Sequence, residues 1–160
     1  MRVYVPVAAP DLARQFASEP GSAYMVTSAL RSLLPDEDQE GLEYAVMLAA
    51  ADACMERIGA EQIEPPRRLV AVAEVPDEAV RQQADTDAHP ALVALEQPVS
   101  WEQVVAIHID EPAAEADIRA AVAGDESAAE RVFERALLWY DVTERIVLAD
   151  DVAAAANDHT

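Results

Sequence analysis

The segment Arg68–Val75 constrains the fold of this chain more than any other stretch. It is a nearly continuous apolar run, rich in valine and bounded by Pro66 and Pro76. Successive side chains of a strand point to opposite faces of a sheet, so a strand that is apolar throughout needs cover on both faces. The run therefore predicts a central strand, with other layers packed on both sides of its sheet.

The rest of the chain alternates between strand and helix signals. Residues 2–5 and 104–109 have the composition of strands. Helices are predicted over residues 37–58, over residues 112–124, which open on a proline and end on a glycine, and over residues 127–140. This order predicts an α/β or α+β fold, a single domain in which a mixed sheet of about five strands packs on helices.

Two of the predicted helices carry apolar stripes that we expect to face the core. The stripe of the first helix consists of Tyr44, Met47, Leu48, Ala51, Met55 and Ile58. The stripe of the last helix consists of Val132, Phe133, Ala136, Leu137 and Tyr140. The side of the first helix opposite its stripe is largely alanine, with Ala49, Ala50 and Ala53, and such small residues permit close approach by another helix or a sheet.

Length and composition indicate one ordinary domain. At 160 residues with 52% hydrophobic residues, the chain is long enough to build a core without disulfides or metals. We expect residues 1–149 to form this domain and the Asp- and Ala-rich residues 150–160 to form a frayed tail. The single cysteine excludes a disulfide framework, and no signal peptide or membrane-spanning run is recognised. A cytoplasmic location is the expectation.

The charge of the chain restricts its partners. There are 31 acids against 11 basic residues, all of them arginines, and the net charge is −20. So acidic a surface disfavours direct binding to nucleic acids and to anionic membranes. The acids are also unevenly distributed, because residues 32–56 hold seven of them and residues 82–118 hold eight, with no arginine in either window. A functional surface is therefore most expected where these windows fold.

The sequence lacks most of the known catalytic motifs. The four glycines are too dispersed to form a phosphate-binding loop, and a Walker A lysine is excluded. One histidine–carboxylate cluster remains, consisting of His108, Asp110 and Glu111 at the end of a predicted strand. These are candidate ligands for a divalent metal, and a small metal-dependent enzyme is the second functional hypothesis. Otherwise no cofactor is expected.

The first functional hypothesis is a non-enzymatic adaptor or regulatory protein whose acidic surface meets a basic protein partner. Candidate contact residues are Asp36, Glu37, Asp38 and Glu40 at the start of the long helix, together with Trp139 and Tyr140. Adjacent aromatic residues on one helix cannot both enter the same core, so one of this pair should lie at an edge, where aromatic residues often make contacts.

Four segments carry a resemblance to a known group of proteins. They are MRVYVP, LPDEDQEGLEYAVMLAAADAC, PRRLVAVAEVPD and LLWYDVTE. In combination they resemble a family of short, acidic, functionally uncharacterised proteins of actinobacteria. The resemblance covers most of the chain but not the tail after about Ala149. It implies a single-domain cytoplasmic protein, and it implies no activity, cofactor or catalytic residue.

Overall fold

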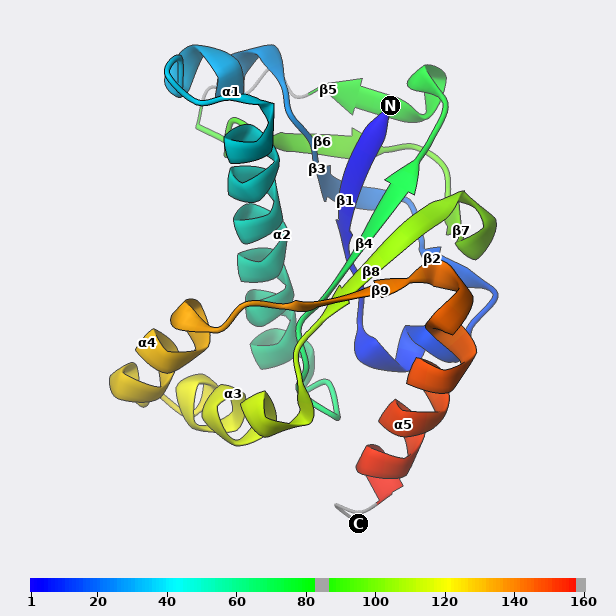
Figure 1. The fold of residues 1–160 in the computed structure, drawn as a ribbon, viewed down its shortest axis with the longest axis vertical. Coiled ribbons are helices and arrows are strands. Elements are labelled where there is room, and N and C mark those ends of the chain that lie inside the picture. Colours follow the sequence, from blue (N-terminus) through cyan, green and yellow to red (C-terminus); the bar gives the residue numbers. More distant parts are fainter. Residues whose placement is uncertain (83–86, 158–160) are drawn as a thin grey trace.

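A seven-stranded sheet runs through the centre of the molecule in the computed structural model, which describes residues 1–82 and 87–157 (Figure 1). The strand order is β5-β6-β3-β1-β4-β8-β9. The strands are β1 (Arg2–Pro6), β3 (Gly21–Tyr24), β4 (Leu69–Glu74), β5 (Val80–Gln82), β6 (Leu92–Leu95), β8 (Val104–Ile109) and β9 (Leu138–Asp141). Two further strands, β2 (Phe16–Ser18) and β7 (Val99–Ser100), pair separately with each other.

The predicted fold class is confirmed, with a difference in the sheet. Each neighbouring pair within the described residues is antiparallel, and the strands number seven rather than about five. The helical crossover from β3 to β4 does make those two strands parallel, but β1 lies between them and runs opposite to both. The additional strands are only three or four residues long, too short for an alternating pattern to reveal them.

Helices cover both faces of the sheet. The long helix α2 (Gln39–Glu61) lies on one face, preceded by the short α1 (Ser28–Leu33), and η1 (Ala9–Ala13) and α5 (Arg145–Asn157) lie on the other. Helices α3 (Glu115–Val122) and α4 (Glu126–Glu134) form a pair against the C-terminal end of α2. Single 3-10 turns are η2 (Asp77–Ala79), η3 (Trp101–Gln103), η4 (Pro112–Ala114) and η5 (Val142–Glu144).

Strand β4 confirms the prediction of a central strand buried on both faces. Leu69, Ala71 and Ala73 point into the core beneath α5, whereas Val70 and Val72 point into the core beneath α2. All five are at most 4% exposed. The apolar run thus reflects a strand between two layers, as the alternation of side chains in a sheet requires.

The tail differs from its expectation as far as it is described. Residues 150–157 continue α5 as regular helix rather than fraying. Leu148 and Val152, one turn apart, are 4% and 3% exposed and pack into the core beside Leu12, and this burial stabilises the helix. Residues 158–160 lie outside the described residues. None of the described helices is long and apolar enough to cross a membrane.

Candidate functional site

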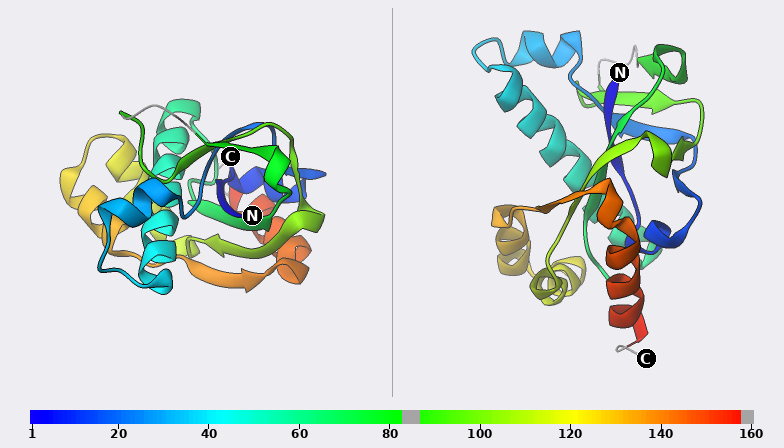
Figure 2. Two further views of the ribbon diagram at one scale, coloured as in Figure 1. Left: turned by 90° about the horizontal axis from the view of Figure 1, so that it is seen from above. Right: turned by 45° about the vertical axis from the view of Figure 1, so that its right-hand side comes forward.

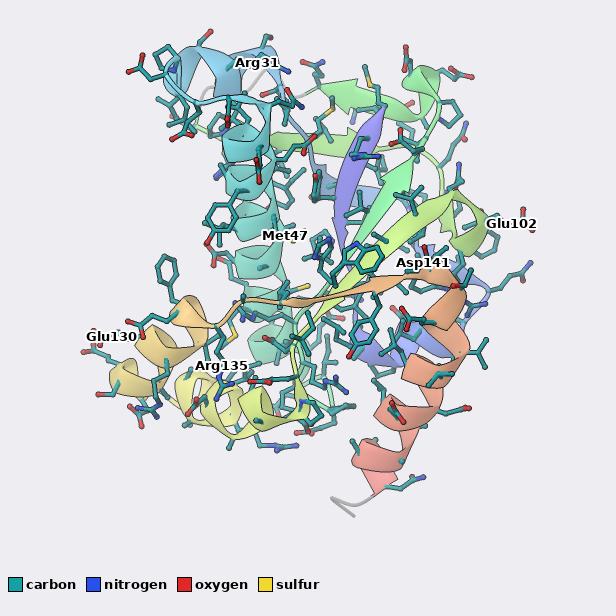
Figure 3. The ribbon with its side chains drawn as sticks, viewed as in Figure 1. Arg31, Met47, Glu102, Glu130, Arg135 and Asp141 are labelled. Carbon is teal, nitrogen blue, oxygen red and sulfur yellow. The ribbon has the colours of Figure 1, made fainter. Side chains whose placement is uncertain are left out.

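A groove of about 650 Å³ opens between α2, the sheet and the segment that joins α4 to β9. Its lining comprises Arg2, Tyr4, Glu40, Glu43, Tyr44, Met47, Leu48, Ala51, Arg68, Val72, Val105, Ala106, His108, Phe133, Glu134, Arg135, Ala136, Leu137 and Trp139. Figure 3 marks Met47 on the α2 wall and Arg135 near the opposite wall. The volume lies within the range typical of ligand-binding pockets.

The face of α2 that packs on the sheet comprises Leu42, Val46, Ala50 and Ala51, and it leaves Tyr44 outside the core. Ala49 and Ala50 are 8% and 0% exposed, whereas Tyr44 is 65% exposed. The expectation that the stripe of Tyr44, Met47, Leu48, Ala51, Met55 and Ile58 faces the core is therefore wrong for Tyr44, whereas Ala51 and Ile58 are buried and Met47 and Met55 pack against the core. Tyr44, Met47 and Leu48 line the groove.

The opposite wall exists because the last predicted helix ends early. Helix α4 stops at Glu134, and residues 138–141 pair with β8 as the edge strand β9. The helix predicted over 127–140 is wrong in its second half, because pairing with a strand some thirty residues earlier in the chain outweighs local helical spacing. Phe133, expected in the core, is exposed and lines the groove, whereas Leu137 lines the groove and also packs against the core beneath α2.

The Trp–Tyr pair is divided between the two faces of the sheet. Tyr140 packs against the core beneath α5, while Trp139 lines the groove and is 61% exposed. Phe133 across the α4–β9 link is 65% exposed. Tyr44, Phe133 and Trp139 thus form a rim of three exposed aromatic rings around the groove. Soluble proteins rarely leave such a concentration of apolar surface uncovered without a binding role.

A buried ion pair closes the floor of the groove. Asp110 is 0% exposed, and its carboxylate accepts three hydrogen bonds from Arg68: from the backbone N–H at 2.9 Å, from Nε at 2.8 Å and from a terminal nitrogen at 2.8 Å. Arg68 also donates to the backbone carbonyl of Arg135 at 3.3 Å. The Asp110 carbonyl accepts from Arg67 at 2.8 Å. The hydrogen bond from Arg68 to Arg135 thus connects the floor of the groove to the C-terminal end of α4.

The candidate metal ligands take three different positions. His108 lies on the groove face of β8, and burial lowers its pKa. Asp110 is occupied by Arg68, and Glu111 pairs with Arg135 at 2.6 Å. Within residues 1–82 and 87–157, no group of three or more His, Cys, Asp or Glu side chains is arranged to hold a metal ion.

The two arginine-free windows differ in how their acids are neutralised. In the window 82–118, five acids pair with arginines from elsewhere in the chain or the same helix: Glu96, Asp110, Glu111, Glu115 and Asp117. In the window 32–56, by contrast, none of the seven described acids forms an ion pair with an arginine. All eleven arginines are engaged in hydrogen bonds or ion pairs.

The unneutralised window lies beside the groove. Asp36, Glu37, Asp38 and Glu40 are exposed at the N-terminal end of α2, where Asp38 caps the helix by accepting from the Gly41 N–H at 2.8 Å. Glu40 also lines the groove, as does Glu43 one turn further along. The structure thus brings the candidate contact residues Glu40 and Trp139 to one groove, while Tyr140 lies on the other face of the sheet.

The family model for a family of unknown function (DUF6912) matches residues 1–149 of the chain. The chain belongs to DUF6912. No curated protein and no solved structure matches it. Membership in DUF6912 agrees with the resemblance to an uncharacterised family, and the match stops before the last two turns of α5.

Sequence reasoning missed two of the three aromatic rim residues, Tyr44 and Phe133. Both lie in stripes with helical spacing, and such a stripe does not reveal whether it meets the core or a groove. The one available signal was the alanine side of α2, which offered the helix a second face on which to pack.

Proposed function

We propose that this protein is a non-enzymatic adaptor or regulatory protein whose groove binds a basic segment of another protein. The observation that carries the proposal is the rim of Tyr44, Phe133 and Trp139 around a concavity of about 650 Å³. Exposed Trp and Tyr are the residues most enriched at binding hot spots. A partner that covers the rim removes their rings from water, and each 100 Å² buried contributes about 2.5 kcal/mol before the costs of association.

Charge identifies the chemistry of the partner. Glu40, Glu43 and Glu134 line the groove, and none of them pairs with an arginine among the described residues. A segment that alternates apolar and basic side chains satisfies both the rings and the carboxylates. Long-range attraction between its cations and a molecule of net charge −20 also accelerates association.

The groove gives less support to metal-dependent catalysis at His108. A divalent metal there needs carboxylate oxygens as further ligands. Those of Asp110 are taken by three hydrogen bonds from Arg68, and Glu111 is paired with Arg135. Freeing Asp110 leaves a buried guanidinium unpaired, which is costly.

A defined peptide tests the proposal. The probe is a blocked octapeptide that alternates arginine and valine, and the comparison is the same peptide with glutamate in place of arginine. Binding is followed by calorimetry and by the fluorescence of Trp139, since the other tryptophan, Trp101, is only 6% exposed. We expect the basic peptide to bind at micromolar concentrations and the acidic peptide not to bind.

Matched charge variants separate groove binding from general attraction. The double variant Glu40→Gln/Glu43→Gln removes two charges at the groove, and Glu78→Gln/Glu102→Gln removes two charges distant from it. We expect the first to weaken binding about two- to thirtyfold, on the basis of about 0.2–1 kcal/mol for each of two exposed ion pairs. Equal weakening by both variants, or no binding of the basic peptide below about millimolar, contradicts the proposal.

A further inference from the structure

No strand within residues 1–82 and 87–157 pairs with the outer edge of β9. This strand stands at one end of the sheet order, with β8 on one side only. Seen from above, it forms the rim of the sheet with no helix or strand beyond it (Figure 2, left). In an antiparallel pair, alternate residues direct their N–H and C=O groups away from the partner strand. The Asp141 N–H donates to the Glu144 carboxylate at 3.0 Å, so by this alternation Trp139 is the residue of β9 that presents a free backbone donor and acceptor outward.

This edge lacks most of the features that protect sheet edges from pairing. Natural edges are commonly blocked by prolines, basic side chains or bulges. Strand β9 is Leu138-Trp139-Tyr140-Asp141, and its register with β8 is uninterrupted. The opposite edge strand, β5, carries Arg81, which pairs with Glu96 on β6's C-terminal side. Strand β9 is protected by its shortness and, at its C-terminal end, by the Glu144 carboxylate that accepts from the Asp141 N–H.

The open edge is also continuous with the groove. Trp139 stands directly opposite His108 in the pairing with β8, and both side chains line the groove. A strand added beside β9 would direct alternate side chains to this same face, next to the exposed ring of Trp139. Its other side chains would face the opposite side, next to Leu138, which is 40% exposed.

We infer that β9 receives an extended basic segment of a partner protein as an eighth strand of the sheet. The inference rests on the proposed function, since the charge of the groove defines the partner. What the inference adds is the binding mode: backbone hydrogen bonds along β9 supply affinity, and alternate side chains in the groove supply specificity. Glu134, exposed at the entry to this edge, favours a basic occupant. A second copy of the chain is disfavoured, because it brings another net charge of −20.

Backbone N-methylation tests this mode. The parent probe is the blocked octapeptide of alternating arginine and valine, and two analogues carry N-methyl groups on either all the arginines or all the valines. A paired strand uses only one of these two sets of amides. We therefore expect one analogue to bind about two- to tenfold more weakly than the parent and the other to bind like the parent, because each lost hydrogen bond is worth roughly 0.5–1.5 kcal/mol.

The outcomes distinguish the binding mode from the proposed function. If both analogues bind like the parent, or both weaken equally, edge pairing is overturned, while groove binding stands as long as Glu40→Gln/Glu43→Gln still weakens the parent. If the parent peptide does not bind, both proposals fail. Hydrogen exchange gives an independent measure: the parent peptide should slow exchange at the outward-facing amide of Trp139, and unchanged exchange there would overturn the mode.

Discussion

Replacement of Asp110 by alanine should destabilise this protein far more than the loss of an ordinary ion pair. The side chains of Arg68 and Asp110 are only 6% and 1% exposed. Without the carboxylate, the guanidinium stays buried and the Arg68 backbone N–H loses its acceptor. Breaking a buried pair by removing one partner costs about 3–5 kcal/mol. For a chain of this size that corresponds to a fall in melting temperature of about 6–20 °C.

The surface pair Arg2–Glu74 is a matched control. Its Nε–carboxylate distance is 2.8 Å, the same as in the buried pair, but its side chains are 49% and 48% exposed. Solvent screens such a pair, so Glu74→Ala should cost at most about 1 kcal/mol. The comparison holds the contact distance constant and varies burial.

Urea unfolding, followed by tryptophan fluorescence and circular dichroism, measures both losses. A double variant, Arg68→Met/Asp110→Leu, completes the experiment, because apolar replacement of both partners is often neutral or stabilising. We expect it to recover most of the stability lost in Asp110→Ala. The reasoning is refuted if Asp110→Ala costs less than about 1 kcal/mol, or no more than Glu74→Ala.

Three further predictions follow from exposure and burial. Phe133→Ser should change the free energy of unfolding by less than about 0.5 kcal/mol, as expected for an exposed side chain, yet weaken binding of the arginine–valine peptide; a large loss of stability would contradict its place on the rim. Burial raises the pKa of Cys54 to about 11, so the thiol should resist iodoacetamide at pH 8 until the chain unfolds, and rapid labelling of the native protein would contradict this. Burial lowers the pKa of His108 below 6.5, so the unfolded chain binds the proton more tightly, and stability should fall as pH drops through the range below about 6.5. In His108→Asn this part of the pH dependence should disappear, as measured by unfolding midpoints; an identical slope in the variant would contradict it.

The interior of the sheet was predictable from the sequence because its signals are local. Strand β8 spans the predicted residues 104–109, and β4 falls within the predicted 68–75. A strand buried on both faces is apolar throughout, so β4 could be recognised from its own residues without knowing which strands lie beside it. Thr27 likewise caps α1 through its own side chain, accepting from the Leu30 N–H at 3.1 Å.

The groove was not predictable, because two of the segments that line it are each compatible with more than one local structure or packing face. Helix α2 had two faces able to pack, and the face with Val46 and Ala50, rather than Tyr44, meets the sheet. Residues 138–141 had helical spacing, and pairing with β8 selected a strand. Both choices are made by contacts distant in sequence, which override propensity. The sequence did predict that one member of the Trp139–Tyr140 pair lies at an edge, because neighbouring aromatic residues cannot share one core, and the structure shows that this member is Trp139.

The alanine packing of α2 has a consequence for how such a groove can change. Ala50 is fully buried between the helix and the sheet and does not line the groove. A larger residue there, such as valine, would lift the helix and widen the opening without altering any surface that a partner touches. The width of the groove and the chemistry of its walls are thus encoded by different residues, so each can vary while the other is kept.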